Sequence, residues 1–174
     1  MSEVYLEFPS KKREQDAMAY LREFRQSGSL INGMGELHKY EDYDKWLKMT
    51  LDYHEGKNVS DNWVRSSEYF FIRKRDDKII GMTGIRHELN AFLIRTGYGH
   101  IGYGIRPSER RQGYATKILE LALGKCGQLG ISEVHVGCLE DNIGSKKVIQ
   151  RNGGVFYQKL INDGEPYLEY VISI

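Results

Sequence analysis

Hydrophobic and polar positions divide the first third of the chain into one short alternating run and two longer helical runs. Residues 4–8 alternate as a β-strand does, whereas residues 15–25 and 42–53 place their apolar side chains at the spacing of an amphipathic helix. A polar stretch without periodicity follows at residues 55–66. This pattern predicts one strand, two helices and a loop, in that order.

The middle of the chain has the pattern of a β-meander. Residues 69–74 and 78–86 are rich in β-branched and aromatic side chains, and the two aspartates between them favour a tight turn. A third run, residues 98–105, stops just before Pro107, because proline cannot donate a hydrogen bond to a neighbouring strand. Three antiparallel strands are therefore predicted here.

The last third predicts a strand–helix–strand crossover followed by a helix and a hairpin. An apolar stripe at helical spacing runs from Ala115 to Cys126, and residues 134–139 then read as a strand, which we expect to be parallel to the strand before the helix. Residues 142–151 read as a helix, and the runs 155–161 and 167–174 flank a turn.

Together these elements predict an α/β (α+β) fold. We expect a mixed, mainly antiparallel sheet of six to seven strands with helices on both faces. The length of 174 residues fits a single domain, residues 1–174, that can bury one sizeable core.

Charge and cysteine content narrow the class of protein. The 25 Lys and Arg residues nearly balance the 24 Asp and Glu residues, so no overall field draws the chain to nucleic acid or to an anionic membrane, and we expect neither as a partner. The first residues lack the apolar core of a secretory signal, which predicts a cytoplasmic protein. Cys126 and Cys138 lie outside any zinc or redox motif, so we interpret them as reduced packing residues and expect no metal.

The candidate chemistry lies where the strand 98–105 leads into the helix that follows Gly113. A helix start presents unpaired backbone N–H groups and a partial positive charge, so it can bind an anion such as a pyrophosphate. Glycine at position 113 allows close approach, and Arg110 and Arg111 add positive charge. An ordinary helix cap is the simpler interpretation, whereas the Walker and dinucleotide-binding patterns do not fit these residues.

Two motifs give this region a family resemblance. Arg110-Arg-Gln-Gly113-Tyr-Ala115 follows a strand that ends in x-Pro, and Asn142-Ile-Gly-Ser145 precedes Asn152-Gly-Gly154 after one further strand. The chain thereby resembles the GNAT acyltransferase superfamily over residues 98–157. The resemblance implies acetyl-CoA as co-substrate, bound between the strands 98–105 and 134–139, which the family splays apart as a parallel pair.

The resemblance also implies which residues contact coenzyme A. The pantetheine arm and thioester lie along the strand, the pyrophosphate lies in the loop, and two polar residues lie across the cleft. The expected cofactor-binding residues are Tyr103, Gly104, Ile105, Arg110, Arg111, Gln112, Gly113, Tyr114, Ala115, Thr116, Asn142 and Ser145. The glycines near this strand suit either a backbone that approaches a ligand or a bulged strand.

The catalytic groups are less defined. Many members of the family carry a tyrosine general acid seven residues after the motif asparagine, and Ile149 stands there in this chain. The acid must then be water or another residue, for which Tyr103 and Tyr114 are the candidates by motif position, unless the thiolate leaves without a proton donor. An alkylamine must also lose a proton before it attacks, and His135 and Glu88 are the candidate bases, although each is equally explained as a surface or core-edge residue.

The predicted function is therefore N-acetyltransfer from acetyl-CoA to a primary amine of a small molecule or peptide, by direct attack in a ternary complex. A catalytically silent acyl-CoA-binding sensor or interaction module is the alternative, and it would bind acetyl-CoA without turnover. The sequence leaves the acceptor amine undefined and a homodimer open.

Overall fold

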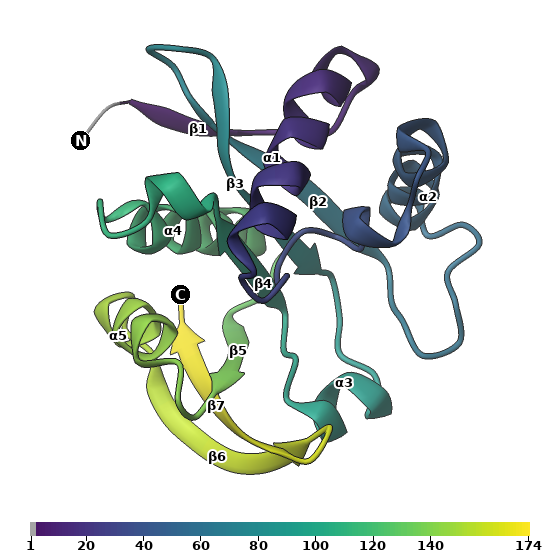
Figure 1. The fold of residues 1–174 in the computed structure, drawn as a ribbon. Helices are drawn as coiled ribbons and strands as arrows, with labels where there is room; N and C mark the ends of the chain where they lie inside the picture. The colour runs from purple at the N-terminus through teal and green to yellow at the C-terminus, as the bar shows by residue number, and fades with distance from the viewer. Residues whose placement is uncertain (1–2) are drawn as a thin grey trace.

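The computed structural model describes residues 3–174 and contains two antiparallel sheets (Figure 1). The larger sheet has four strands in the order β1-β2-β3-β4, with the bounds β1 (Val4–Glu7), β2 (Ser66–Arg73), β3 (Lys78–Arg86) and β4 (Ile101–Ile105). The smaller sheet has three strands in the order β5-β7-β6, with the bounds β5 (Glu133–Leu139), β6 (Val155–Asn162) and β7 (Glu165–Ser173). The predicted class and strand number are confirmed.

Helices cover both faces of the larger sheet (Figure 1). One face carries α1 (Glu14–Ser27) and α2 (Tyr43–Glu55), whose side chains pack on Phe70, Ile72 and Met82. The opposite face carries α4 (Tyr114–Gln128), which, together with α5 (Ile143–Arg151), also covers the smaller sheet. A short α3 (Ala91–Thr96) and three 3₁₀ helices, Lys11–Arg13, Leu37–Lys39 and Pro107–Glu109, complete the fold.

The strands β4 and β5 do not form a continuous ladder. They meet at one isolated bridge between Gly99 and Val136, beside which the His100 N–H donates to the His135 carbonyl at 2.7 Å. Gly99 has a φ of 62°, and a Cβ there would lie 2.3 Å from the His135 carbonyl oxygen, so a larger residue would push the two segments apart. The strands β4 and β5 are therefore splayed apart at the centre of the fold.

Three details differ from the sequence prediction. The sheet is divided in two at the splay, and the single bridge there is antiparallel, so residues 3–174 contain no parallel ladder. The strand expected from residue 98 begins at Ile101. The connection before it contains α3, which at six residues is too short for a periodic pattern and is started by Asn90, whose side chain accepts from the Leu93 N–H.

Candidate active site

The strand β4 has a free hydrogen-bonding edge that faces the splay. Arg86 N–H donates to His100 O, and Arg106 N–H donates to Ile80 O, so the even-numbered residues of β4 direct their backbone groups toward β3. Because an antiparallel pair alternates, Tyr103 and Ile105 direct their N–H and C=O groups to the opposite edge. The Ile105 carbonyl accepts from Arg110 Nε at 3.2 Å, whereas the backbone groups of Tyr103 on this edge can hydrogen-bond an extended ligand in the way that another strand would.

A cleft of about 890 Å³ lies along this edge. It is bounded by β4, the start of α4, the start of α5 and the loop after α1, and it is lined by every residue expected to bind coenzyme A except Gln112. The cleft is also lined by residues that were not among those expected to bind coenzyme A: Phe24, Ser29, Leu30, Asn32, Glu109, Asp141, Ile143, Gly144, Lys147, Val148 and Arg151.

The start of α4 forms an anion-binding corner of the cleft. Arg111 and Gly113 both have positive φ, 64° and 83°, which turns successive backbone N–H groups toward one side. Within residues 3–174, the N–H groups of residues 111–115 donate no hydrogen bond. These donors, together with the helix dipole and the exposed Arg111, can hold a phosphate group.

Arg110 builds the wall of the cleft next to this corner. Its guanidinium lies over the ring of Phe24, 5.3 Å from the centroid, and donates to Ser29 Oγ at 3.0 Å and to Ile105 O at 3.2 Å. The charge is therefore fixed between α1 and β4 instead of moving freely in solvent.

Gln112 lies behind the loop, where a buried ion pair supports it. The amide of Gln112 donates to Glu109, and Arg73 forms a bidentate pair with Glu109 at 2.5 Å and 3.1 Å. Burial alone would raise the pKa of Glu109, but the hydrogen bonds from Arg73 and Lys78 lower it. The Gln112 side chain is therefore turned to Glu109, while its backbone N–H belongs to the anion-binding corner, and its role at the pyrophosphate stays a prediction.

The wall formed by α5 begins at its N-cap residue, Asn142. The Asn142 side chain accepts from the Ser145 N–H at 3.0 Å, so the motif asparagine caps the helix at the rim of the cleft. Ile149 is fully buried in the core between α4, α5 and the smaller sheet. The position at which the family often carries its tyrosine therefore does not line the cleft in this chain.

Tyr103 supplies the phenol that α5 lacks. It lines the cleft, and its hydroxyl is buried without a hydrogen-bond partner among the described residues. Burial raises the pKa of Tyr103 above its usual value, an effect that nearby Ser145 partly offsets. The hydroxyl is therefore protonated at neutral pH and has a proton to donate.

The two bases expected from the sequence lie outside the cleft. His135 Nδ1 is 2.8 Å from the buried Glu169 carboxylate, and its backbone N–H donates to His100 Nδ1 at 3.0 Å. Burial, with smaller contributions from His135 and Arg86, lowers the pKa of His100 to about 4. Glu88 is exposed in the connection between β3 and α3. Neither His135 nor Glu88 lines a cavity described here, so their role as bases stays a prediction.

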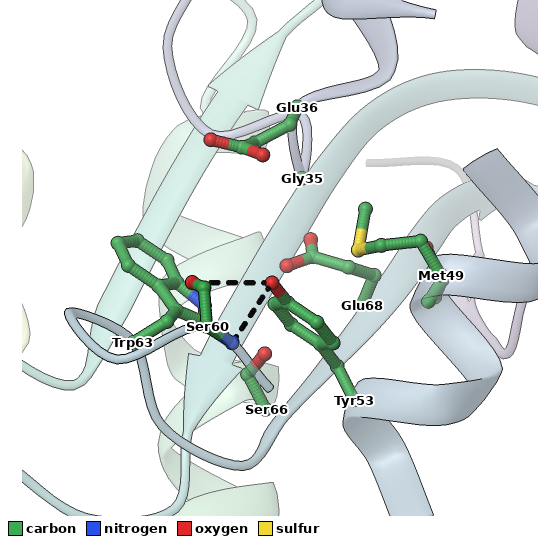
Figure 2. Close-up of a pocket in the computed structure, with 9 residues that line it drawn as sticks. Gly35, Glu36, Met49, Tyr53, Ser60, Trp63, Ser66 and Glu68 are labelled. Atoms are coloured by element: carbon green, nitrogen blue, oxygen red, sulfur yellow. Dashed lines mark hydrogen bonds between the residues drawn. The ribbon is translucent and has the colours of Figure 1, made fainter. Parts of the chain in front are cut away.

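A second, small cavity of about 60 Å³ contains a carboxylate that the sequence analysis missed. Figure 2 shows the Glu68 carboxylate pointing into it from β2, with Glu36 above and Tyr53 and Trp63 beside it. The remaining lining residues are Gly35, Met49, Thr50, Ser60 and Ser66.

Glu68 is in an unusual electrostatic state. Its Oε2 atom is buried without a hydrogen-bond partner, and the carboxylate forms no ion pair within residues 3–174. Burial raises the pKa of Glu68 to about 7, against a smaller opposing effect of Arg86. The strand pattern contained a signal for this residue, since Glu68 shares the inward face of β2 with Phe70 and Ile72.

The splayed strand, the glycine loop and the cleft between them define an acyltransferase of the GNAT class. A comparison with protein families agrees, because residues 10–155 match the model described as an acetyltransferase (GNAT) domain. The chain belongs to this family.

A curated relative is similar over part of the chain. The uncharacterized N-acetyltransferase YjdG of Bacillus subtilis (strain 168) is 28% identical over 106 residues, which are 58% of this chain. The match spans 59% of the length of that relative.

Solved structures share the fold over nearly the whole chain. The ribosomal L7/L12 α-N-protein acetyltransferase RimL in complex with coenzyme A has a TM-score of 0.73 at 14% identity, with 100% of this chain and 96% of that chain covered. The microcin C7 self-immunity acetyltransferase MccE in complex with acetyl-CoA and AMP has a TM-score of 0.70 at 15% identity, with 99% and 93% covered. At these identities the likeness shows the fold.

No helix within residues 3–174 is long and apolar enough to cross a membrane. Over the same residues, no group of three or more His, Cys, Asp or Glu side chains could hold a metal ion.

Proposed function

We propose that this chain transfers an acetyl group from acetyl-CoA to a primary amine of a small molecule or peptide, by direct attack in a ternary complex in the cytoplasm. The observation that carries the proposal is that two sets of free backbone groups line one cleft. One set lies at the edge of β4, and the other lies at the start of α4. The first set suits the pantetheine amides, and the second suits a pyrophosphate.

Two groups of Tyr103 can serve different steps of the reaction. The Tyr103 N–H can donate to the thioester oxygen and stabilise the negative charge that develops there when a neutral amine attacks the carbonyl carbon. As the C–S bond breaks, the Tyr103 hydroxyl can donate a proton to the sulfur. The proton lost by the amine passes to solvent or to a nearby base.

A panel of amines tests the proposal when the release of free coenzyme A thiol is measured. We expect release to depend on the amine and to exceed the slow hydrolysis of acetyl-CoA alone. Acetyl-CoA binding without turnover of any amine would instead support the alternative, a silent binding module.

A Cys138→Ala variant should retain most of its activity. Burial raises the pKa of the Cys138 thiol to about 11, so at neutral pH it is not the thiolate that an acyl-enzyme would require. Turnover and the intact mass of the enzyme after exposure to acetyl-CoA measure this. An acetyl adduct that a later addition of amine removes would contradict direct transfer.

A Tyr103→Phe variant should lose at least about tenfold in kcat at unchanged acetyl-CoA affinity, because it removes the buried proton donor and leaves the backbone of β4 in place. Tyr157→Phe is the matched control, since Tyr157 is 58% exposed on β6 and lines neither cavity. Full activity of the Tyr103 variant would remove this residue from the catalytic group.

A further inference from the structure

We propose that the small cavity around Glu68 binds the ammonium group of the acceptor, so that the enzyme selects primary alkylamines. This inference rests on the proposed acetyltransferase function and adds the acceptor site to it. Four observations carry it: the position of the cavity, its size, its charge and its lining.

The cavity and the coenzyme cleft lie on either side of the same strand pair. An idealised Cβ on Gly84 would lie 2.5 Å from a Glu68 carboxylate oxygen, so the carboxylate lies directly over β3 at this glycine. Gly84 pairs with Gly102 of β4, the residue before Tyr103. Neighbouring strands are about 4.8 Å apart, so the carboxylate lies about one strand spacing from the backbone of β4.

One loop borders both spaces. Between α1 and α2, Ser29, Leu30 and Asn32 line the coenzyme cleft, and Gly35 and Glu36 line the small cavity. Gly33 lies between them, so close to the backbone of Tyr103 that an idealised Cβ there would be 2.1 Å from the carbonyl carbon. The loop therefore holds the two cavities in a fixed relation.

The size of the cavity suits a small head group. A cavity of about 60 Å³ is large enough to hold an ammonium group with its first carbons.

The charges and polar groups of the cavity suit a cation. Glu68 supplies a carboxylate, and the hydroxyls of Ser60, Ser66 and Thr50 supply acceptors, Thr50 Oγ1 being buried without a partner among the described residues. Arg86 donates to Tyr98 O and Gly99 O, and its charge only partly offsets the effect of burial on the pKa of Glu68. An ammonium would give the Glu68 carboxylate an ion-pair partner, which it lacks among the described residues.

Two acceptors separate the recognition of charge from the transfer itself. Propylamine is a cation at pH 8, whereas hydroxylamine is neutral there and lacks the alkyl arm. Glu68→Gln should raise the KM for propylamine about tenfold or more and leave the KM for hydroxylamine and the Kd for acetyl-CoA nearly unchanged. The fold is checked by the melting temperature of each variant.

Two further variants control for charge and for folding. Glu55→Gln removes the same charge from an exposed position at the end of α2 and should leave both KM values unchanged. Gly84→Ala keeps the charge but displaces the carboxylate, because the new Cβ would overlap it, and should raise the KM for propylamine as Glu68→Gln does.

Direct binding distinguishes failure of this inference from failure of the proposed function. Calorimetric titration of propylammonium into the enzyme with coenzyme A should show binding that Glu68→Gln removes. If the wild type acetylates other amines but does not bind propylammonium, or if Glu68→Gln changes both acceptors equally, the acceptor site lies elsewhere and the acetyltransferase function still stands.

Discussion

Replacing Gly113 with valine should abolish acetyl-CoA binding while leaving the fold intact. Gly113 has a φ of 83°, where a β-branched side chain is strained, so a valine there should distort the loop that presents the free N–H groups. A hydrogen bond to a charged group contributes about 1.5–3 kcal/mol, so the loss of two such contacts weakens binding by at least about 100-fold. Isothermal titration calorimetry with acetyl-CoA measures the change.

Gly124→Val is the matched control for this change. Gly124 lies in the same helix, α4, on its exposed side, and a Cβ there meets no atom within 4 Å. This variant should bind acetyl-CoA as the wild type does, and both variants should keep the circular dichroism spectrum of the native fold. Unchanged affinity of the Gly113 variant would show that the start of α4 is not the pyrophosphate site.

The order of the elements could be predicted because each one carries a local signal. The strand β3 begins at Lys78 and ends at Arg86 as its β-branched pattern predicts, and α4 follows its apolar stripe to within a few residues. The division into two sheets has no such signal. It depends on the close contact of Gly99 with the His135 carbonyl, which is a contact between distant parts of the chain.

The coenzyme side of the site could be predicted because its parts are adjacent in the sequence. A strand end, a glycine and a helix start make the anion-binding corner wherever they occur together, and Arg111 and Gly113 do so here. The catalytic side could not be predicted in the same way. The sequence made His135 a candidate base, but its pairing with Glu169 depends on the register between β5 and β7.

Glu68 shows why the acceptor side required the structure. Nothing near Glu68 in the sequence indicates a pocket, since the other walls come from the loop after α1, from α2 and from the segment before β2. The available signal was a single acidic residue on the strand face that also carries Phe70 and Ile72. A buried carboxylate without a partner costs stability, so its presence on that face indicates a function and not packing.

That cost predicts how stability depends on pH. The pKa of Glu68 is about 7 in the folded chain, against 4.5 for an unperturbed glutamate. Between these two values the folded state holds a proton that the unfolded state has released, so this group makes the wild type less stable as pH rises through that window. Arg86, Glu36 and the Tyr53 side chain are the charged or titratable groups around it, and burial outweighs the effect of Arg86.

Glu68→Gln should therefore be more stable than the wild type at pH 8 and gain much less at pH 5. A pKa raised from 4.5 to about 7 corresponds to about 3 kcal/mol, so the gain at pH 8 should exceed the gain at pH 5 by about 1–3 kcal/mol. Urea unfolding of both proteins at the two pH values measures it. Glu55→Gln is the control: the pKa of Glu55 is lowered by its hydrogen bond to Lys57, so removing that charge cannot produce a gain that grows with pH. The stability difference between Glu68→Gln and the wild type could instead stay constant from pH 5 to pH 8. Glu68 would then have the same pKa in the folded chain as in the unfolded one. In that case burial would not destabilise its charge, and an incoming ammonium would gain little from pairing with it.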